Sequence, residues 1–198
     1  MQSNFEDLIT SFLEKRIGVS NDFLPFDLAA KLQLNLETLY QQKVLKAAGI
    51  GNDRLLNRDE KIRRDKIFWL DKKDKNLHEE KFFSIIDAFV LYLNSTCFTG
   101  IKSYEFHYAL YEKGAFYKKH LDQFKTDNGR AFSMIIYLNE GWKVEDGGEL
   151  KIYQTTEIQL IAPENQKCVF FKSNELEHEV LLTNVSRMSI TGWLKTTL

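Results

Sequence analysis

The stretch Arg187-Met-Ser-Ile-Thr191-Gly-Trp193 alternates between polar or aromatic residues and apolar or small ones. Successive side chains of a β-strand point to opposite faces of the sheet. Arg187, Thr191 and Trp193 would therefore share one face with Ser189, and the residues between them would form an apolar face. The pattern predicts a strand whose polar side lines a cavity.

The stretch Ser133-Met-Ile-Ile-Tyr137-Leu-Asn139 repeats this alternation and places Tyr137 on the same side as Ser133. Because a guanidinium is a planar fork that suits a carboxylate, Arg187 and Tyr137 are candidates to bind one anion together. From Tyr104 onward, similar short runs are separated by turn signals, which predicts an all-β second half of the chain. These signals are Lys113-Gly114, Asn128-Gly129, Glu140-Gly141, Asp146-Gly147-Gly148 and Pro163-Glu-Asn165.

The first half of the chain carries apolar residues at helical spacing. A candidate capping box, Ser3-x-x-Glu6, opens the first predicted helix, and Pro25 opens a second that would end at the Gly49–Asn52 cluster. A third helix is expected over about 79–93. The apolar stripe of each predicted helix is expected to pack in the hydrophobic core. The three stripes are Phe5, Leu8, Ile9, Phe12 and Leu13; Leu28, Leu32, Leu36 and Leu39; and Phe82, Phe83, Ile86, Phe89, Val90 and Leu93.

A candidate metal site lies in Tyr117-Lys-Lys-His120-Leu-Asp122-Gln-Phe124. In an extended strand, His120 and Asp122 project to the same side and could chelate one ion. His178 could complete the set from another strand. Two imidazoles and one carboxylate can occupy one face of an octahedral iron and leave the other face open. Taken alone, a His-x-Asp pair would more simply be a solvated surface pair.

Taken together, these motifs resemble a known family. Their order along the chain is similar to that in the 2-oxoglutarate- and Fe(II)-dependent oxygenases, specifically the prolyl 4-hydroxylases. The motifs are, in order, Tyr111, His120-x-Asp122, Arg130, Tyr137-Leu-Asn139, Gly147-Gly148-x-Leu150, His178 and Arg187…Trp193. The likeness is greatest to the branch that hydroxylates hypoxia-inducible factor (EGL-nine) and its bacterial relatives. That branch has a segment similar to Ile62–Trp69, and collagen-type enzymes usually have Lys where Arg187 stands.

The resemblance implies an α+β fold, in which a double-stranded β-helix (jelly-roll) core has N-terminal helices packed against one sheet. It implies Fe(II) held by His120, Asp122 and His178, with 2-oxoglutarate and O2 as co-substrates and ascorbate as an accessory reductant. Arg187 would bind the distal carboxylate of 2-oxoglutarate, with Tyr137, Tyr111 and Thr191 in the same pocket. Trp193 would shape the substrate site.

The segment between Gly49 and Lys75 is highly charged, which is typical of a solvated loop. Its similarity to the family segment favours instead a flap over the substrate, and we expect Asp65 to pair with Arg130 and hold that flap against the barrel. A flap favours a proline-containing protein or peptide substrate, and in the bacterial relatives the implied target is a translation component such as elongation factor Tu. The alternatives are hydroxylation of a free amino acid or other small molecule, and a non-catalytic sensor or binding module.

Length and composition are consistent with one domain. The 198 residues, 43% of them hydrophobic, can bury a substantial core, which we divide into helical support and flap (1–100) and the jelly-roll catalytic core (101–198). The net charge of −1 gives no indication of a nucleic-acid or membrane partner. Without a signal-like N-terminus or a long apolar run, the chain is expected to be cytoplasmic. Cys97 and Cys168 are expected to be reduced and buried.

Overall fold

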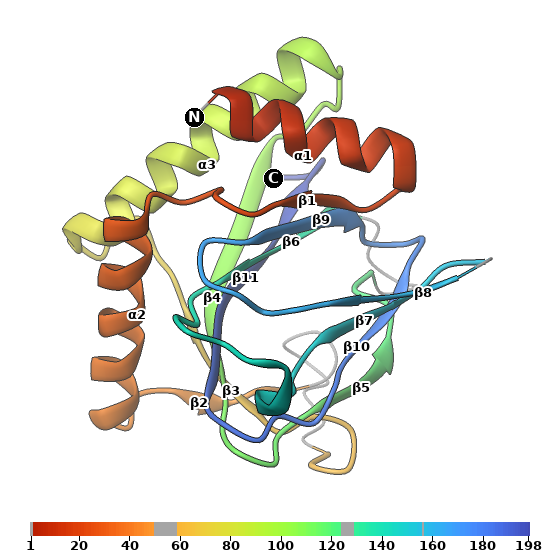
Figure 1. The fold of residues 1–198 in the computed structure, drawn as a ribbon. Coiled ribbons are helices and arrows are strands. Elements are labelled where there is room, and N and C mark those ends of the chain that lie inside the picture. The colour runs from red at the N-terminus through yellow and green to blue at the C-terminus, as the bar shows by residue number, and fades with distance from the viewer. Residues whose placement is uncertain (1, 50–58, 124–128, 156) are drawn as a thin grey trace.

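The computed structural model describes residues 2–49, 59–123, 129–155 and 157–198. Within them, two antiparallel sheets form the double-stranded β-helix predicted for the second half (Figure 1). The larger sheet has the order β1 (Gly18–Ser20), β9 (Cys168–Lys172), β6 (Arg130–Tyr137), β11 (Arg187–Lys195), β4 (Ser103–Tyr111), β3 (Asp65–Trp69), β2 (Lys46–Ala47). The smaller has the order β5 (Tyr117–His120), β10 (Glu177–Val180), β7 (Leu150–Tyr153), β8 (Ile158–Ile161).

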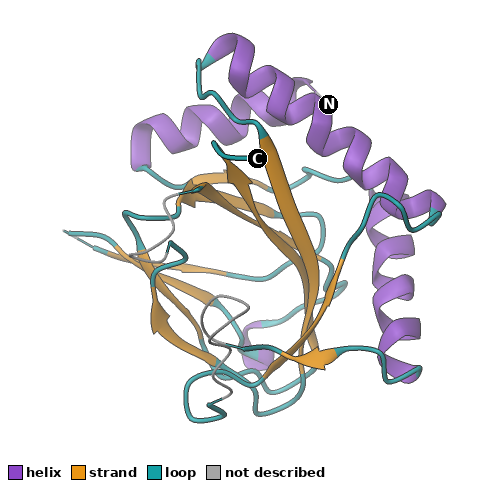
Figure 2. Cartoon of the chain, turned by 180° about the vertical axis from the view of Figure 1, so that it is seen from behind, coloured by secondary structure: helices purple, strands orange, loops and turns teal. Residues whose placement is uncertain are grey.

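Three helices cover the outer face of the larger sheet, as Figures 1 and 2 show from opposite sides. They are α1 (Gln2–Lys15), α2 (Phe26–Gln41) and α3 (Leu77–Thr96), and a short 3-10 helix, η1 (Val144–Asp146), precedes β7. Their apolar stripes pack on one face of the large sheet through side chains such as Phe89, Phe170 and Ile190. This layer agrees with the predicted α+β architecture.

The strand β11 separates two cores, as its alternation predicted. Met188, Ile190 and Leu194 face the helices, while a second apolar cluster, which includes Tyr111 and Tyr137, fills the space between the two sheets. Gly192 is required where β11 pairs with β4, because a Cβ there would lie 2.2 Å from the carbonyl oxygen of Glu105. Close packing against β4 therefore keeps the polar face of β11 turned toward the inside of the barrel.

Several expectations need correction. Helix α2 ends at Gln41, well before the predicted Gly49–Asn52 cluster, because Lys43 adopts a left-handed φ of 58° and the chain then enters β2. Leu13 is 74% exposed and lies outside the core. Cys168 is buried, but Cys97 is exposed, and both are free.

The first hundred residues contain α1, α2 and α3, and β1, β2 and β3 from the same part of the chain join the larger sheet. The side chain of Ser3, residues 50–58 of the charged segment, and Phe124 and Asn128 lie outside the described part. No helix within that part is long and apolar enough to cross a membrane.

Candidate metal centre and co-substrate pocket

The three predicted metal ligands lie together on β5 and β10 of the smaller sheet and just after β5. His120 ends β5, and His178 lies opposite it in β10 in the antiparallel register. Asp122 follows β5 by two residues and places one carboxylate oxygen 3.5 Å from Nε2 of His120 and the other 3.5 Å from Nε2 of His178. All three ligand atoms lie within 4.8 Å of one another. Such spacing allows one ion to contact all three side chains.

Backbone carbonyls fix which imidazole nitrogen faces the site. Nδ1 of His120 lies 2.7 Å from the carbonyl oxygen of Lys118, and Nδ1 of His178 lies 3.1 Å from that of Leu176. An Nδ1–H that donates to these oxygens leaves each Nε2 with a free lone pair, which is the form that binds a metal. Burial lowers the pKa of His178 and so favours its neutral, ligating form.

Asp122 is held as a carboxylate although it is buried. Burial alone would raise the pKa of its carboxyl group, but His178, His120 and the Ser133 hydroxyl lower the pKa well below its usual range. The Ser133 hydroxyl donates to Oδ2 at 2.7 Å and also contacts the Ser173 hydroxyl at 2.9 Å. The alternation in 133–139 places Ser133 on the same face as Tyr137 but does not indicate that Ser133 bonds to the metal ligand Asp122.

Beside the triad lies a buried cation, Arg187, for which the described residues provide no acidic partner. Arg187 is 2% exposed, and its Nε donates to the carbonyl oxygen of Gly148 at 2.7 Å. Its Nη2 and the Tyr137 hydroxyl are buried without hydrogen-bond partners in the described part of the chain. A buried, uncompensated charge is costly, so this geometry favours an anionic ligand.

Other predicted pocket residues surround this cation. The Arg187 guanidinium lies 4.9 Å from the ring centre of Tyr111 and 5.0 Å from that of Tyr137. Burial raises the pKa of Tyr137 to about 12, although Arg187 opposes the shift, so the hydroxyl stays protonated and can donate. A cavity of about 40 Å³ joins the triad to Arg187, with Tyr111 and Thr191 in its lining. The structure thus brings Tyr111, Thr191 and Arg187 together in one cavity with Tyr137 beside Arg187, and their role in binding the co-substrate stays a prediction.

The predicted Asp65–Arg130 pair is wrong. Asp65 is buried and bonds to Arg63 at 2.6 and 2.8 Å, whereas Arg130 pairs with Glu105 at 2.8 Å. Two strands, β4 and β11, separate β3 from β6 in the sheet, so the two side chains start on distant strands. The Arg63–Asp65 pair spans i and i+2, the same spacing as His120-x-Asp122, and that signal was present in the sequence.

Asp65 is nevertheless connected to the metal ligand His120 through Arg63 and Tyr117. Arg63 lies 4.2 Å above the ring centre of Tyr117, and the Tyr117 ring stacks on the His120 ring at 3.6 Å. This column of side chains supports the outer face of one metal ligand. Tyr117 lies in the motif quoted for the metal site, but nothing in the sequence distinguished stacking from ordinary core packing.

Arg130 and Trp193 lie next to the site, where Nη1 of Arg130 donates to the main-chain carbonyl oxygen of Asp122 at 3.3 Å. The Arg130 guanidinium lies 3.5 Å from the ring centre of Trp193 and is held there by Glu105. The Trp193 ring in turn lies 6.2 Å from that of Trp69 and 5.5 Å from that of His107. Burial lowers the pKa of His107 to about 3, so this histidine is neutral.

Comparison with known proteins agrees with this geometry. Residues 106–195 match the 2OG-Fe(II) oxygenase superfamily. A crystal structure of a prolyl-4-hydroxylase from Pseudomonas putida shares 32% identity over 96% of this chain and 98% of that one, with a TM-score of 0.88. The chain belongs to the prolyl 4-hydroxylase family of 2-oxoglutarate- and Fe(II)-dependent oxygenases.

Two further likenesses of the oxygenase are more limited. A Trichoplax adhaerens prolyl hydroxylase, solved with a peptide of hypoxia-inducible factor, shares the fold at 24% identity over 98% of this chain and 91% of that one, with a TM-score of 0.85. Mouse prolyl 3-hydroxylase OGFOD1 is 34% identical over 76 residues, which cover 33% of this chain and only 14% of the mouse enzyme.

The residues of the oxygenase fit the cofactors of its family, Fe(II) with 2-oxoglutarate and O2. The triad provides two neutral imidazoles and one carboxylate, which is the ligand set of non-haem iron oxygenases. Nη2 of Arg187, which has no hydrogen-bond partner in the described part of the chain, can donate to a carboxylate. These two features lie in one cavity, as a ligand that chelates the metal and carries a distal carboxylate requires.

Proposed function

We propose that this oxygenase hydroxylates C4 of prolyl residues in a protein substrate. The observation that carries the proposal is the 32% identity with a bacterial prolyl-4-hydroxylase over nearly the whole of both chains. The geometry supports it, because Trp193, Trp69 and the Arg130 guanidinium form an aromatic shelf beside the pocket. Such a shelf suits a small apolar ring.

Each residue of the site has a defined task under this proposal. His120, Asp122 and His178 would hold Fe(II), which would supply the oxidative chemistry in which 2-oxoglutarate and O2 are consumed and 2-oxoglutarate becomes succinate and carbon dioxide. Arg187 and Tyr137 bind the distal carboxylate with a charge-assisted fork and a neutral hydroxyl. Tyr111 and Thr191 line the pocket between them, and the surrounding apolar residues exclude water. The protein thus orients and shields the reacting groups.

The proposal extends to the kind of target. We infer a cytoplasmic protein with an accessible proline loop, with a translation component such as elongation factor Tu as the first candidate. Ascorbate would act as an accessory reductant. Asp65 supports this activity through Arg63 and Tyr117, while Trp193 and Arg130 contact the substrate.

The test is product mapping. The iron-loaded protein is incubated with 2-oxoglutarate and a bacterial lysate, and in parallel with purified elongation factor Tu, under ¹⁸O₂. We expect proline peptides that gain one labelled oxygen, and none with the Asp122→Ala variant. If succinate forms but the label appears only on free amino acids, the enzyme acts on small molecules and the protein-substrate proposal fails.

A further inference from the structure

The strand β4 has an open edge next to the site. The partner strand β3 pairs only with residues 107–111 of β4, and the last bond between them runs from the Leu70 amide to the Phe106 carbonyl at 2.9 Å. A turn at Asp71 then directs the chain away toward α3.

The unpaired groups on this edge belong to two residues. Alternate residues of an antiparallel strand direct their amide and carbonyl to the same side, so Tyr104 and Phe106 face the place that β3 has left. No group in the described ranges bonds to the Tyr104 amide, the Tyr104 carbonyl or the Phe106 amide. Two donors and one acceptor of the main chain are therefore available.

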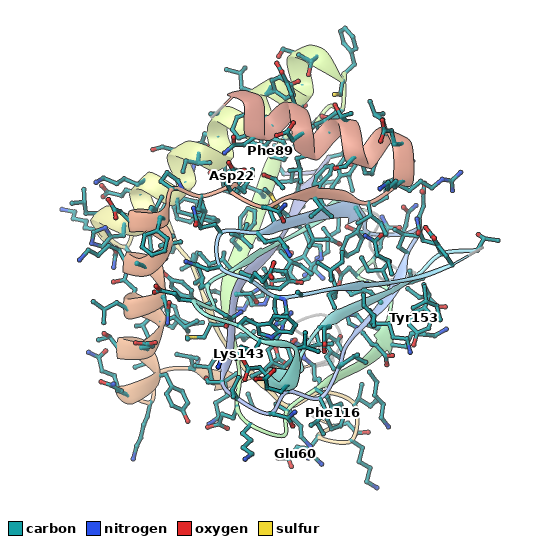
Figure 3. The ribbon with its side chains drawn as sticks, in the orientation of Figure 1. Asp22, Glu60, Phe89, Phe116, Lys143 and Tyr153 are labelled. Atoms are coloured by element: carbon teal, nitrogen blue, oxygen red, sulfur yellow. The ribbon has the colours of Figure 1, made fainter. Side chains whose placement is uncertain are left out.

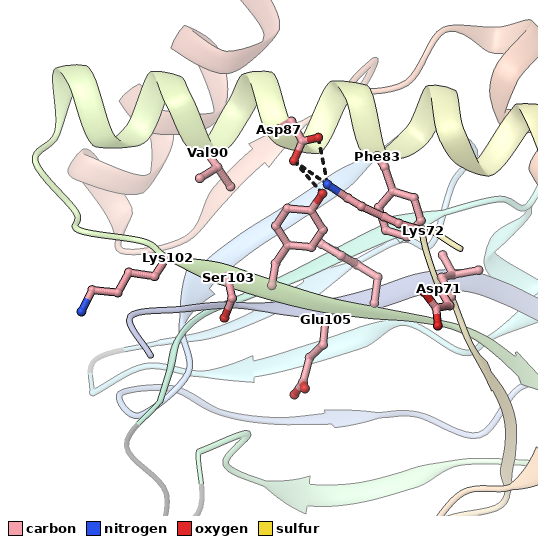
Figure 4. Close-up of a pocket in the computed structure, with 11 residues that line it drawn as sticks. Asp71, Lys72, Phe83, Asp87, Val90, Lys102, Ser103 and Glu105 are labelled. Atoms are coloured by element: carbon pink, nitrogen blue, oxygen red, sulfur yellow. Dashed lines mark hydrogen bonds and ion pairs between the residues drawn. The ribbon is translucent and has the colours of Figure 1, made fainter. Parts of the chain in front are cut away.

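This edge opens into a preformed groove of about 480 Å³ between β4, the segment 70–72 and α3. Figure 4 shows Lys72 reaching Asp87 of α3, while Glu105 points away from that helix. The Tyr104 hydroxyl also donates to Asp87 at 2.6 Å, and the Tyr104 ring stacks on Phe83. Since the wall side chains hold one another in place, a ligand would not need to order them first.

One residue of the groove, Glu105, also contacts the proposed substrate shelf. Glu105 lines the groove and also holds Arg130 over Trp193. In the sheet, Trp193 lies opposite Glu105, and Thr191 of the metal pocket lies opposite His107. Two residues along a strand span about 7 Å. A strand added beyond β4 would lie two strand spacings of about 4.8 Å from Trp193, so an extended chain with one residue on the shelf reaches the open edge with residues about three or more positions away.

We propose that the edge of β4 at Tyr104 and Phe106 binds an extended flanking segment of the polypeptide substrate as an added strand. The inference rests on the proposed prolyl hydroxylation and names how that substrate is held. Main-chain hydrogen bonds at a sheet edge recognise backbone and not sequence. The charges around the groove are mixed, with Lys72 and Lys102 beside Asp71 and Asp87, so neither an acidic nor a basic segment is selected.

The test compares two pools of synthetic peptides centred on proline with randomised flanks. Short peptides with about two residues on either side cannot reach the groove, and long ones with about ten can. We expect the wild-type kcat/KM for hydroxyproline formation to be roughly 5- to 100-fold higher for the long pool, the effect of two backbone hydrogen bonds. Equal rates for both pools would overturn the edge proposal and leave prolyl hydroxylation intact.

The variant is Tyr104→Pro, with Tyr104→Ala as its matched control. Both remove the ring, but only proline also removes the amide, and proline is tolerated where the amide points out of the sheet. Tyr104→Pro should lose the long-peptide advantage and keep the rate on short peptides, whereas Tyr104→Ala should keep both. Equal losses in the two variants contradict a role for the amide.

A second measurement uses the wild-type protein and does not depend on folding of a variant. Amide hydrogen exchange at Tyr104 and Phe106 should slow when the long pool is added and stay fast with the short pool. Identical exchange with both pools overturns the proposal. Absence of hydroxyproline from both pools would instead contradict the proposed function, and the edge proposal with it.

Discussion

At the scale of single residues, the site is defined by buried charged and polar groups that lack partners within the described part of the protein. Among the residues that the structure describes, the buried Arg187 has no acidic partner, and the Tyr137 hydroxyl beside it has no hydrogen-bond partner. Next to them, Asp122 remains ionised between two imidazoles. A metal ion and a dicarboxylate would together satisfy these groups. The metal ion would compensate the negative charge of Asp122, and the dicarboxylate would compensate the positive charge of Arg187.

The metal ligands give the first prediction. His120→Ala, Asp122→Ala and His178→Ala should each abolish succinate formation, since each removes one of three ligands. The fold should remain, because it depends on the two apolar cores. Iron content, succinate release and circular dichroism check this for each variant. Near-normal turnover by any one variant at limiting iron would remove that residue from the triad.

Ser133→Ala is the matched control for the triad. It leaves all three ligands but deletes the 2.7 Å bond to Asp122. Loss of such an outer partner typically costs roughly 10- to 100-fold in metal affinity or activity. Iron affinity should therefore fall between that of the wild type and that of Asp122→Ala.

The second prediction concerns Arg187. Loss of a charge-assisted fork to a buried carboxylate should cost on the order of 2–4 kcal/mol, or roughly 30- to 1,000-fold in 2-oxoglutarate affinity. Arg187→Ala should show this loss while iron binding survives, and Arg187→Lys should be intermediate because Lys offers a point charge without the fork. The measurement is iron-dependent 2-oxoglutarate binding with metal content determined in parallel. Unchanged affinity in Arg187→Ala would place the co-substrate elsewhere.

At the scale of elements, β11 connects the two cores and the site. Its apolar side packs under the helices, and its polar side carries Arg187, Thr191 and Trp193 into the barrel. The helices contribute no residue to the metal pocket. Their role is to cover the large sheet and keep its strands in register, so changes in them should alter stability without altering the chemistry.

The cap of α3 tests this separation. Asn76 accepts hydrogen bonds from the amides of His78 and Glu79 and from the side chain of Asn35. Replacing such a cap by Ala costs about 0.5–2 kcal/mol. Asn76→Ala should lower the free energy of unfolding by about this amount in urea denaturation, with unchanged iron and 2-oxoglutarate affinity. Asn76→Asp keeps an acceptor and should stay near wild type; an equal loss in both variants would exclude capping as the cause.

At the scale of the whole molecule, the seven-stranded sheet carries both the shelf and the open edge of β4, while the smaller sheet carries the metal ligands His120 and His178. The two sheets must remain packed for these parts to meet. Stability of the entire fold is therefore a condition for activity, and it should depend on pH through groups that are buried without charge.

His107 gives the pH prediction. Its pKa in the folded protein is about 3, below the ordinary value of 6.5, because it is buried. As pH falls below about 6.5, His107 binds a proton in the unfolded chain but stays neutral in the folded protein. The contribution of His107 to the free energy of unfolding is therefore highest above this pH and decreases as pH falls below it. The limiting slope is about 1.4 kcal/mol per pH unit.

The check is urea denaturation of the metal-free protein between about pH 7 and pH 5. His107→Phe keeps an aromatic ring between Trp69 and Trp193 but cannot bind a proton. Wild type should lose stability faster than this variant as pH falls, and the difference between the two curves isolates His107 from other titrating groups. Parallel curves would show that His107 is protonated equally in both states.

Local periodicity in the amino-acid sequence accounts for part of the fold and of the site. Alternation placed Arg187, Thr191 and Trp193 on one face and made His120 and Asp122 a chelating pair, because a strand repeats every two residues. Helical spacing identified three helices whose stripes form the outer core. The order of motifs indicated the family before any distance was known.

Tertiary structure alone decided the partners. In the folded chain Asp65 pairs with Arg63, and Arg130 pairs with Glu105. The Tyr117 ring stacks on His120, and the Ser133 hydroxyl donates a hydrogen bond to Asp122. Tertiary structure also ended α2 at Gln41, brought β1–β3 into the larger sheet and left the edge of β4 open. Local periodicity fixes the face on which a side chain lies, but which strands become neighbours depends on how the sheets pack, and only neighbouring strands bring side chains from distant parts of the chain into contact.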